Sequence, residues 1–133
     1  MGAVSAGLLD THALVWALTS PERLSARARE LVEDRSVALW VSAGSAWEIA
    51  TKHRLGKMPG IEGLLAGWDR QLGRLGAREL PISSAHARLA GSLDWSHRDP
   101  FDRMLVAQAS LEGLPILTRD PQIAAYPQAT AIW

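Results

Sequence analysis

Short apolar runs alternate with stretches of helical periodicity along the whole chain of 133 residues. The runs with strand character are Val4–Leu9, Val37–Val41, Arg78–Pro81, Pro115–Thr118 and Ala129–Ile132. The helices expected between them cover Thr11–Leu18, Ser25–Asp34, Ser45–Leu55, Ile61–Leu75, Ser83–Leu93 and Pro100–Leu111. This alternation predicts an α/β fold of three layers, α/β/α, with a short central, mostly parallel sheet. No internal repeat or linker interrupts it, so we expect residues 1–133 to form a single domain.

The composition excludes several kinds of protein. The chain has no cysteine, so disulfides and thiolate-bound zinc or iron–sulfur clusters are ruled out. Fourteen acidic and fourteen basic residues give a net charge of zero, whereas a protein that holds nucleic acid by bulk charge would be basic. The apolar segment Met1–Leu9 lacks a basic flank, and no run approaches the roughly 20 apolar residues of a membrane span. We therefore expect a cytoplasmic protein without a membrane partner.

Acidic residues stand at the points where the expected strands end or helices begin. Asp10 and Asp120 follow two strands, Asp99 and Asp102 flank the Pro100 that opens a helix, and Glu48 lies one turn into another helix. In an open parallel sheet, ligands bind outside the carboxyl ends of the strands, where the strand order reverses. Five acids from four segments are thus expected to converge on one edge.

Each acid also has a structural explanation. Asp10, Asp99 and Asp120 are plausible helix N-caps, worth about 1 kcal/mol each, and Glu48 can pair with Lys52 one turn away. As a group, however, carboxylates about 4 Å apart repel by roughly 4 kcal/mol at an effective dielectric constant near 20. A bound cation would relieve that repulsion. Oxygen ligands favour Mg²⁺ or Mn²⁺, which suits phosphoryl chemistry.

Four motifs in one order resemble the PIN-domain toxins of the VapC type. They are Leu8–Trp16, Trp47–Ala50, His97–Arg103 with Ala107–Ala109, and Leu117–Asp120. The resemblance extends from Leu8 to Tyr126. It implies a metal-dependent endoribonuclease, the toxin of a type II toxin–antitoxin pair, which hydrolyses RNA phosphodiesters to 5′-phosphate and 3′-hydroxyl ends. It also implies a VapB-like antitoxin whose C-terminal segment lies along the surface, and we expect a homodimer. By physical analogy, our hypothesis is that an antitoxin arginine enters the acidic pocket and replaces the cation.

The resemblance assigns catalytic and metal-binding roles to Asp10, Glu48, Asp102 and Asp120, with Asp10 and Asp102 favoured as direct ligands of Mg²⁺ or Mn²⁺. Three residues are candidates for support of the site: Thr11, Asp99 and Arg103. Candidate contacts to RNA are Lys52, Arg54, Lys57 and Arg119. Purely structural explanations stay open for these basic residues. The stretch Lys52–Lys57 is also typical of a solvated helix face, and Arg103 and Arg119 also suit pairing with carboxylates. His12 has no assigned role.

The tryptophans give a further set of expectations. Trp16, Trp40 and Trp47 are expected in the core. Trp68 lies on an apolar stripe that suits either the core or a groove for a partner.

The alternative reading is a non-hydrolytic Mg²⁺-binding signalling or interaction domain of α/β fold. A phosphoacceptor of the response-regulator kind would need paired acids after the first strand and a lysine near the last, and Ala129–Trp133 contains none. A phosphatase with an aspartate nucleophile would need a second aspartate where His12 stands. A pure interaction module leaves the converging acids unexplained, so the nuclease is favoured.

Overall fold

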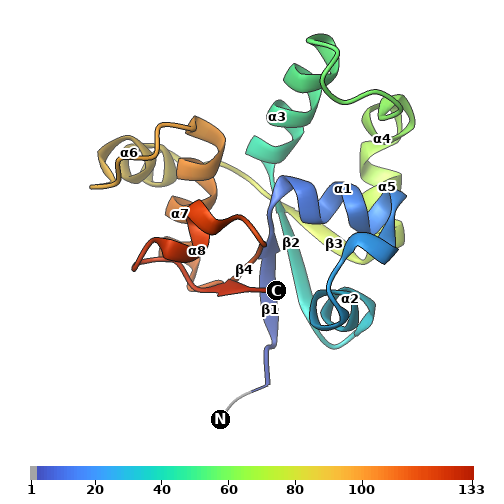
Figure 1. Cartoon of the computed structure of the whole chain (residues 1–133), viewed down its shortest axis with the longest axis horizontal. Helices are drawn as coiled ribbons and strands as arrows, with labels where there is room; N and C mark the ends of the chain where they lie inside the picture. The colour runs from blue at the N-terminus through green and yellow to red at the C-terminus, as the bar shows by residue number, and fades with distance from the viewer. Residues whose placement is uncertain (1–2) are drawn as a thin grey trace.

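Five short parallel strands form the centre of the protein, as seen in a computed structural model that describes residues 3–133 (Figure 1). They are β1 (Ala6–Leu9), β2 (Ala38–Ser42), β3 (Ala77–Leu80), β4 (Ile116–Leu117) and β5 (Ala131–Ile132). Their order in the sheet is β3-β2-β1-β4-β5, and all four neighbouring pairs are parallel. The expected parallel sheet is confirmed.

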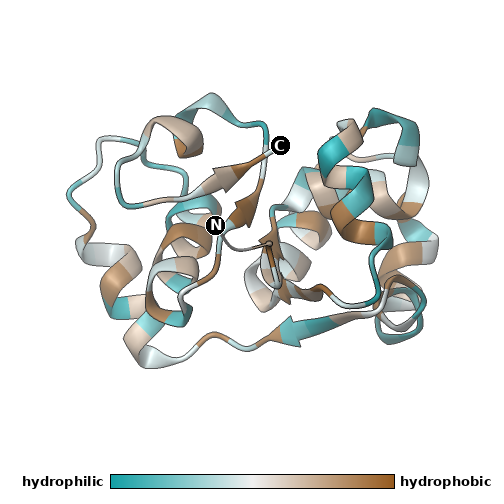
Figure 2. Cartoon of the chain, turned by 90° about the horizontal axis from the view of Figure 1, so that it is seen from below, coloured by the Kyte–Doolittle hydropathy of each residue, from teal (hydrophilic) through white to brown (hydrophobic). Residues whose placement is uncertain are grey.

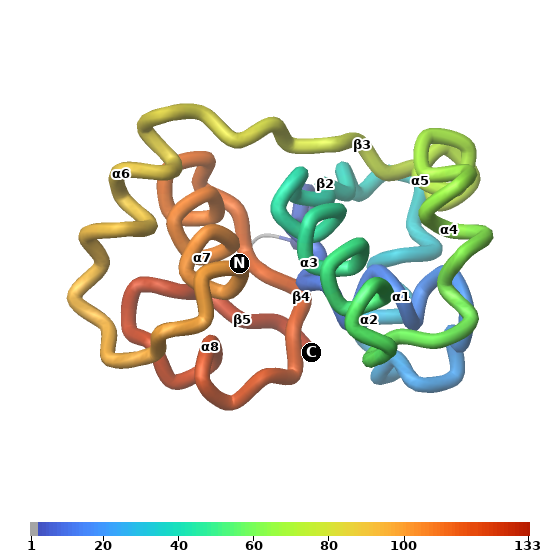
Figure 3. The backbone as a smooth tube through the Cα atoms, turned by 90° about the horizontal axis from the view of Figure 1, so that it is seen from above, coloured from blue at the N-terminus to red at the C-terminus, as the bar shows by residue number. Residues whose placement is uncertain are grey.

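Helices cover both faces of this sheet. They are α1 (Thr11–Thr19), the 3₁₀ turn η1 (Pro21–Arg23), α2 (Ala26–Glu33), α3 (Ala43–Arg54), α4 (Glu62–Ala66), α5 (Trp68–Leu75), α6 (Ser84–Ser92), α7 (Pro100–Glu112) and α8 (Pro121–Ala125). Figures 1 and 3 place α1, α2, α4 and α5 on one side and α6, α7 and α8 on the other. Helix α3 contacts α1, α4 and α7, so it joins the two sides. Within residues 3–133, no helix has the length and apolar character needed to cross a membrane.

Successive side chains of the strands pack into two separate hydrophobic cores, one on each face of the sheet. Leu9 packs with α1, α3, α4 and α5, whereas its neighbour Leu8 packs with α7 and α8 on the opposite face. Because successive strand residues point to opposite faces, Leu8 and Leu9 bury one side chain in each of the two cores. Figure 2 shows the result, with mostly brown strands in the middle of the molecule and teal segments on the helices outside them. The sheet is therefore packed against an apolar core on each of its two faces.

The single helix expected over Ile61–Leu75 is wrong, because the chain breaks at Gly67 into α4 and α5. Gly67 has φ −113° and ψ 36°, and glycine is a poor helix former. A Cβ at this position would lie only 2.7 Å from the Arg70 guanidinium. The apolar spacing runs on across the break because α4 and α5 pack on the same core.

The expectation that three tryptophans lie in the core also needs correction. Trp47 is 61% exposed, since α3 turns Glu48 and Ile49 inward instead, and its ring packs edge-on against Phe101 at 4.8 Å. Trp40 is half-buried against the core of α7 and α8. Trp16 is half-buried outside both cores, whereas Trp68 packs against the core on the α1 side.

Candidate functional site

The strand order reverses between β1 and β4, and two of the predicted acids stand at that point. Asp10 follows β1 directly and Asp120 follows β4 after two residues. The Asp10 amide donates to the Leu117 carbonyl across the two strands at 3.1 Å. Open α/β sheets bind their ligands in the crevice at this reversal. The structure thus brings Asp10 and Asp120 to the expected edge.

Asp10 is a buried carboxylate that caps α1. Its Oδ1 accepts from the Ala13 amide at 2.7 Å, and only 6% of the residue is exposed. Burial raises the pKa of Asp10, while the Thr118 hydroxyl and the Ala13 amide lower it and Asp120 raises it further. A carboxylate disfavoured in its charged form gains from a cation placed beside it. Asp120 caps α8 by accepting from the Gln122 amide at 2.8 Å.

Glu48 is held by partners on two helices. The Thr11 hydroxyl donates to Glu48 Oε1 at 2.6 Å, and Thr11 Oγ1 and Ser45 Oγ share a hydrogen bond of 3.0 Å. Lys52 pairs with the other oxygen, Oε2. Glu48 is 4% exposed, so this arrangement is fixed inside the protein. Lys52, a candidate RNA contact, is engaged here with Glu48.

Asp99 and Asp102 lie at the start of α7 as the sequence predicts. Asp99 Oδ1 accepts from the amides of Phe101 (2.9 Å) and Asp102 (3.1 Å), which confirms its role as an N-cap. Asp102 Oδ2 lies 2.7 Å from His97 Nε2. Among residues 3–133, the one group of three ligand atoms within 4.8 Å of one another comes from His97, Asp99 and Asp102.

The electrostatics of Asp102 connect it with the other acids. Burial is the largest cause that raises the pKa of Asp102, to about 6, against a hydrogen bond with His97 that lowers it. The charges of Asp99, Asp120 and Glu48 each raise this pKa further. Asp102 therefore lies in the field of Asp99, Glu48 and Asp120, and Asp10 is linked to this group through the charge of Asp120.

His97 is a site neighbour that the sequence analysis missed. It falls within the His97–Arg103 motif, but its contact with Asp102 depends on how the loop before α7 folds back. The ring also packs against Trp95, with centroids 4.9 Å apart.

Within residues 3–133, Arg103 forms no ion pair with a carboxylate, so the expected pairing is wrong, while its support of the site stays a prediction. Its guanidinium donates to backbone carbonyls at the end of α6 and in the loop that precedes α7. The acceptors are Ala90 (2.9 Å), Leu93 (2.8 Å), Trp95 (2.8 Å) and His97 (3.0 Å). The carbonyls of an irregular loop need donors, and one planar guanidinium supplies several. Arg103 thereby fixes the loop that carries His97 and Asp99.

The other basic candidates lie on the surface. Arg54 and Lys57 are exposed near the end of α3 and beyond it, where their contact with RNA stays a prediction. Arg119 is exposed, and its Cζ lies 5.2 Å from the centre of the Trp16 ring. Within the part of the chain that the structure describes, Arg119 forms no ion pair with a carboxylate, so that expectation fails.

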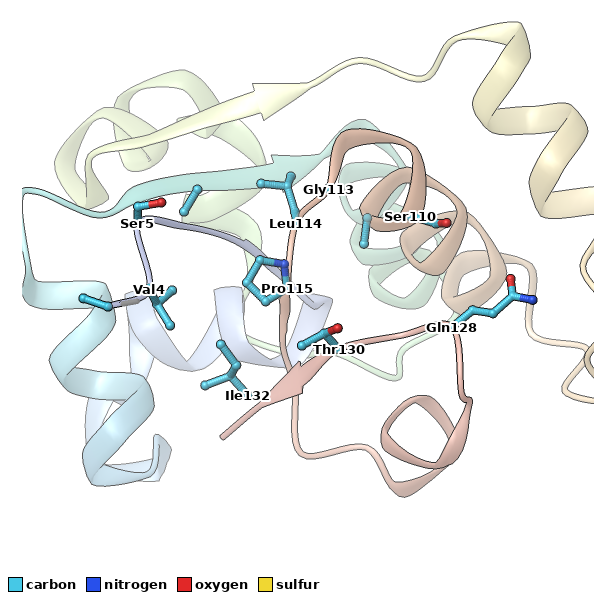
Figure 4. Close-up of a pocket in the computed structure, with 12 residues that line it drawn as sticks. Val4, Ser5, Ser110, Gly113, Leu114, Pro115, Gln128, Thr130 and Ile132 are labelled. Carbon is cyan, nitrogen blue, oxygen red and sulfur yellow. The ribbon is translucent and has the colours of Figure 1, made fainter. Parts of the chain in front are cut away.

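A cavity of about 370 Å³ opens beside the reversal of the sheet. Its lining residues are Asp10, His12, Trp16, Arg119, Asp120 and Pro121. A larger cavity, of about 540 Å³, lies at the opposite edge, where strands β1, β4 and β5 begin, and none of its lining residues is ionisable (Figure 4). Of these two cavities, only the smaller one offers carboxylates to a metal ion. Carboxylate oxygens, with the imidazoles of His12 at the cavity and His97 beside Asp102, fit Mg²⁺ or Mn²⁺.

Comparison with known proteins agrees with this geometry. The sequence model of the PIN domain matches residues 7–128, so the chain belongs to the PIN-domain family. Ribonuclease VapC22 of Mycobacterium tuberculosis is 30% identical over 129 residues, which cover 95% of the chain and 97% of the relative. Ribonuclease VapC16 of the same organism is 37% identical over 73 residues, and this match spans about half of each protein (53% and 52%).

Two solved structures share the fold. VapBC2 from Rickettsia felis, bound to a DNA fragment from its promoter, gives a TM-score of 0.69 at 16% identity and covers 96% of this chain and 97% of that one. A toxin–antitoxin complex from Klebsiella pneumoniae gives 0.66 at 17% identity, with 96% of each chain covered. The predicted PIN-like α/β/α architecture is confirmed.

Proposed function

We propose that this PIN-domain protein is a metal-dependent endoribonuclease and the toxin of a type II toxin–antitoxin pair. One observation carries the proposal: Asp10 and Asp120 stand at the reversal of a parallel sheet, Thr11 beside Asp10 donates to Glu48, and the charges of Glu48 and Asp120 raise the pKa of Asp102. The relatives named ribonucleases VapC22 and VapC16 support the same activity.

In this proposal Asp10 and Asp102 bind the metal ion directly, and Glu48 and Asp120 complete or support the site. When bound, Mg²⁺ or Mn²⁺ supplies a water of lowered pKa and offsets the charge that develops on the phosphate. The protein's part is to hold the ligands in place. Thr11 orients Glu48, His97 orients Asp102, and the Asp99 cap together with Arg103 fixes the first turn of α7.

The proposed reaction is the hydrolysis of an RNA phosphodiester. A water oxygen bonds to phosphorus in line with the departing 3′-oxygen, which leaves with a proton. The products are 5′-phosphate and 3′-hydroxyl ends. Nothing in this chemistry needs the 2′-hydroxyl, so the assignment to RNA rests on the family and its named ribonucleases.

The proposed partner is a small antitoxin, and the two structural neighbours support it because one is described as a toxin–antitoxin complex and the other as VapBC2. A buried carboxylate such as Asp10, which lines the same cavity as Asp120, is also a site that an antitoxin arginine would neutralise. Homodimerisation and a cytoplasmic location stay predictions. An alanine scan of the antitoxin's basic residues tests the arginine, since inhibition that survives every substitution would remove this part of the proposal.

Cleavage of RNA tests the proposed function. Partner-free protein is incubated with a panel of end-labelled structured RNAs in Mg²⁺ or Mn²⁺ and in EDTA. We expect cleavage that needs the metal and is lost in Asp10→Asn and in Asp102→Asn but kept in Asp94→Asn, an exposed acid outside the cluster. Cleavage that survives in EDTA, or in both site variants, would contradict the proposal.

A further inference from the structure

We propose that the cavity lined by Asp10, His12, Trp16, Arg119, Asp120 and Pro121, here called the nucleotide pocket, binds the base of an unpaired RNA nucleotide next to the scissile phosphate. This inference rests on the proposed function and adds a binding subsite to it. The acids form one part of the pocket, and an aromatic and cationic wall forms the other.

The aromatic wall comes from one face of α1. His12 and Trp16 are four residues apart, so they lie one turn from each other on the same side of the helix. Their ring centroids are 5.7 Å apart with the planes tilted by 48°. Trp16 is half-buried and lies outside both apolar cores, and His12 is exposed. Trp16 also packs against Trp133, with ring centroids 6.0 Å apart, so the part of the indole that lines the cavity is the surface on which a base can stack.

The cationic part comes from the loop between β4 and α8. Arg119 directly precedes Asp120, and its Cζ lies 5.2 Å from the Trp16 ring. A guanidinium at this distance gains from the face of the indole while its N–H groups stay available to a phosphate. Because Arg119 and Asp120 are adjacent, a phosphate held by Arg119 lies close to the acids that would hold the metal.

Size and charge favour a nucleotide over other ligands. The volume of about 370 Å³ is near the lower end of the range of about 300–1,000 Å³ for small-ligand sites. A nucleotide offers a neutral aromatic base to Trp16 and an anionic phosphate to Arg119. The chain as a whole has no net charge, so contacts of this local kind must supply RNA affinity. Stacking requires an exposed base, so the pocket selects unpaired RNA over duplex.

Binding measurements test the pocket separately from catalysis. Each variant is made in the Asp102→Asn background, and fluorescence anisotropy records its binding to a fluorescein-labelled, random-sequence single-stranded oligoribonucleotide. Trp16→Leu is expected to weaken binding about tenfold or more, and Trp16→Phe by much less because it keeps an aromatic face. Arg119→Ala is expected to weaken binding by about fivefold.

Arg23→Ala is the matched control. Arg23 also lies over the Trp16 ring, with Cζ at 5.6 Å, but it does not line the pocket. We expect this variant to bind within about twofold of its parent. If Trp16→Leu and Arg119→Ala keep their thermal stability and bind like Arg23→Ala, the pocket is not the base-binding site.

Photo-cross-linking locates the base without reference to activity. An oligoribonucleotide that contains 4-thiouridine is irradiated with the protein, and mass spectrometry identifies the modified peptide. We expect cross-links to the α1 segment that carries His12 and Trp16. Cross-links confined to the segment of Lys52 and Lys57 would overturn the inference, while metal-dependent cleavage lost in Asp10→Asn would leave the proposed nuclease standing.

Discussion

The two edges of the sheet differ in chemistry more than in size. The amino edge carries the larger cavity, about 540 Å³, without an ionisable side chain, and the carboxyl edge carries about 370 Å³ with two carboxylates, an imidazole and a guanidinium (Figure 4). Volume alone would select the amino edge. Buried charge selects the carboxyl edge, and there Asp10 and Asp102 have raised pKa values.

The topology explains why charge gathers at one edge. Helices α1, α3, α7 and α8 all begin there, and their N-caps are Asp10, Ser42, Asp99 and Asp120. The N-terminus of a helix favours negative charge, whereas α7 ends near the amino edge at Gly113. Capping and metal binding are therefore compatible roles for one aspartate: Asp10 caps α1 through Oδ1 and is still a candidate ligand.

The largest expected effect is on metal affinity at the carboxyl edge. Asp10→Asn and Asp102→Asn each replace a proposed anionic ligand by a neutral amide, so we expect Mn²⁺ affinity to fall by about 100-fold or more. Isothermal titration calorimetry measures this, with Asp94→Asn as the control that keeps the affinity of the parent. Unchanged affinity in both site variants would place the metal elsewhere.

Removal of Arg103 should cost stability, because the Ala90 carbonyl of α6 and three carbonyls of the following loop lose their donor. We expect Arg103→Ala to lower the free energy of unfolding by about 2–4 kcal/mol, measured by urea denaturation. Arg29→Ala is the control, since its pair with Glu33 is exposed and worth less than about 1 kcal/mol. A loss for Arg103→Ala no larger than that of the control would show that the loop is held by other contacts.

The metal-free protein should lose stability as the pH rises from about 4 to 6, between the unfolded and folded pKa values of Asp102. The pKa of Asp102 is raised to about 6 in the folded state, so the folded protein binds this proton more tightly than the unfolded chain does. Stability is then greatest below the unfolded pKa and falls as Asp102 ionises, and Asp10 acts in the same direction.

Melting temperatures measured in EDTA across this pH range test the sign. Asp102→Asn, which has no proton to lose, should show a shallower fall and should melt a few degrees above the parent near neutral pH. If the melting temperatures of parent and variant fall equally with pH, the ionisation of Asp102 is not the cause of the lost stability.

The smallest effects are expected at the amino edge. Gln128→Ala and Thr130→Val alter the lining of the larger cavity without touching a charged group. We expect RNA cleavage and Mn²⁺ affinity within about twofold of the parent. A loss of cleavage or Mn²⁺ affinity as large as that of Asp10→Asn would show that the amino edge takes part in the function.

Local signals in the sequence were sufficient for the fold and for the positions of the acids. The capping acids Asp10, Asp99 and Asp120 stand where they were expected, because the hydrogen-bonding needs of a helix start are met within three residues. The positions of the strands follow from apolar runs that must be buried on both faces. The break at Gly67 was missed because α4 and α5 share one core and so continue one pattern.

Contacts that depend on an irregular loop could not be predicted. Arg103 donates to backbone carbonyl groups of residues 90–97. Every residue type carries such a carbonyl, so the sequence does not show which ones accept from Arg103. The approach of His97 to Asp102 follows from that loop. Trp47 was misplaced because α3 packs between two helical layers, so its sequence does not show which apolar residue faces outward.

Paramagnetic broadening by Mn²⁺ tests the central claim most directly, namely that the metal and the chemistry belong to the carboxyl edge. In ¹⁵N-labelled protein, substoichiometric Mn²⁺ should broaden the amide signals of Asp10, Asp102 and Asp120 and leave those of Gly113 and Thr130 sharp. Broadening centred on Gly113 and Thr130, or spread evenly over the chain, would contradict the account.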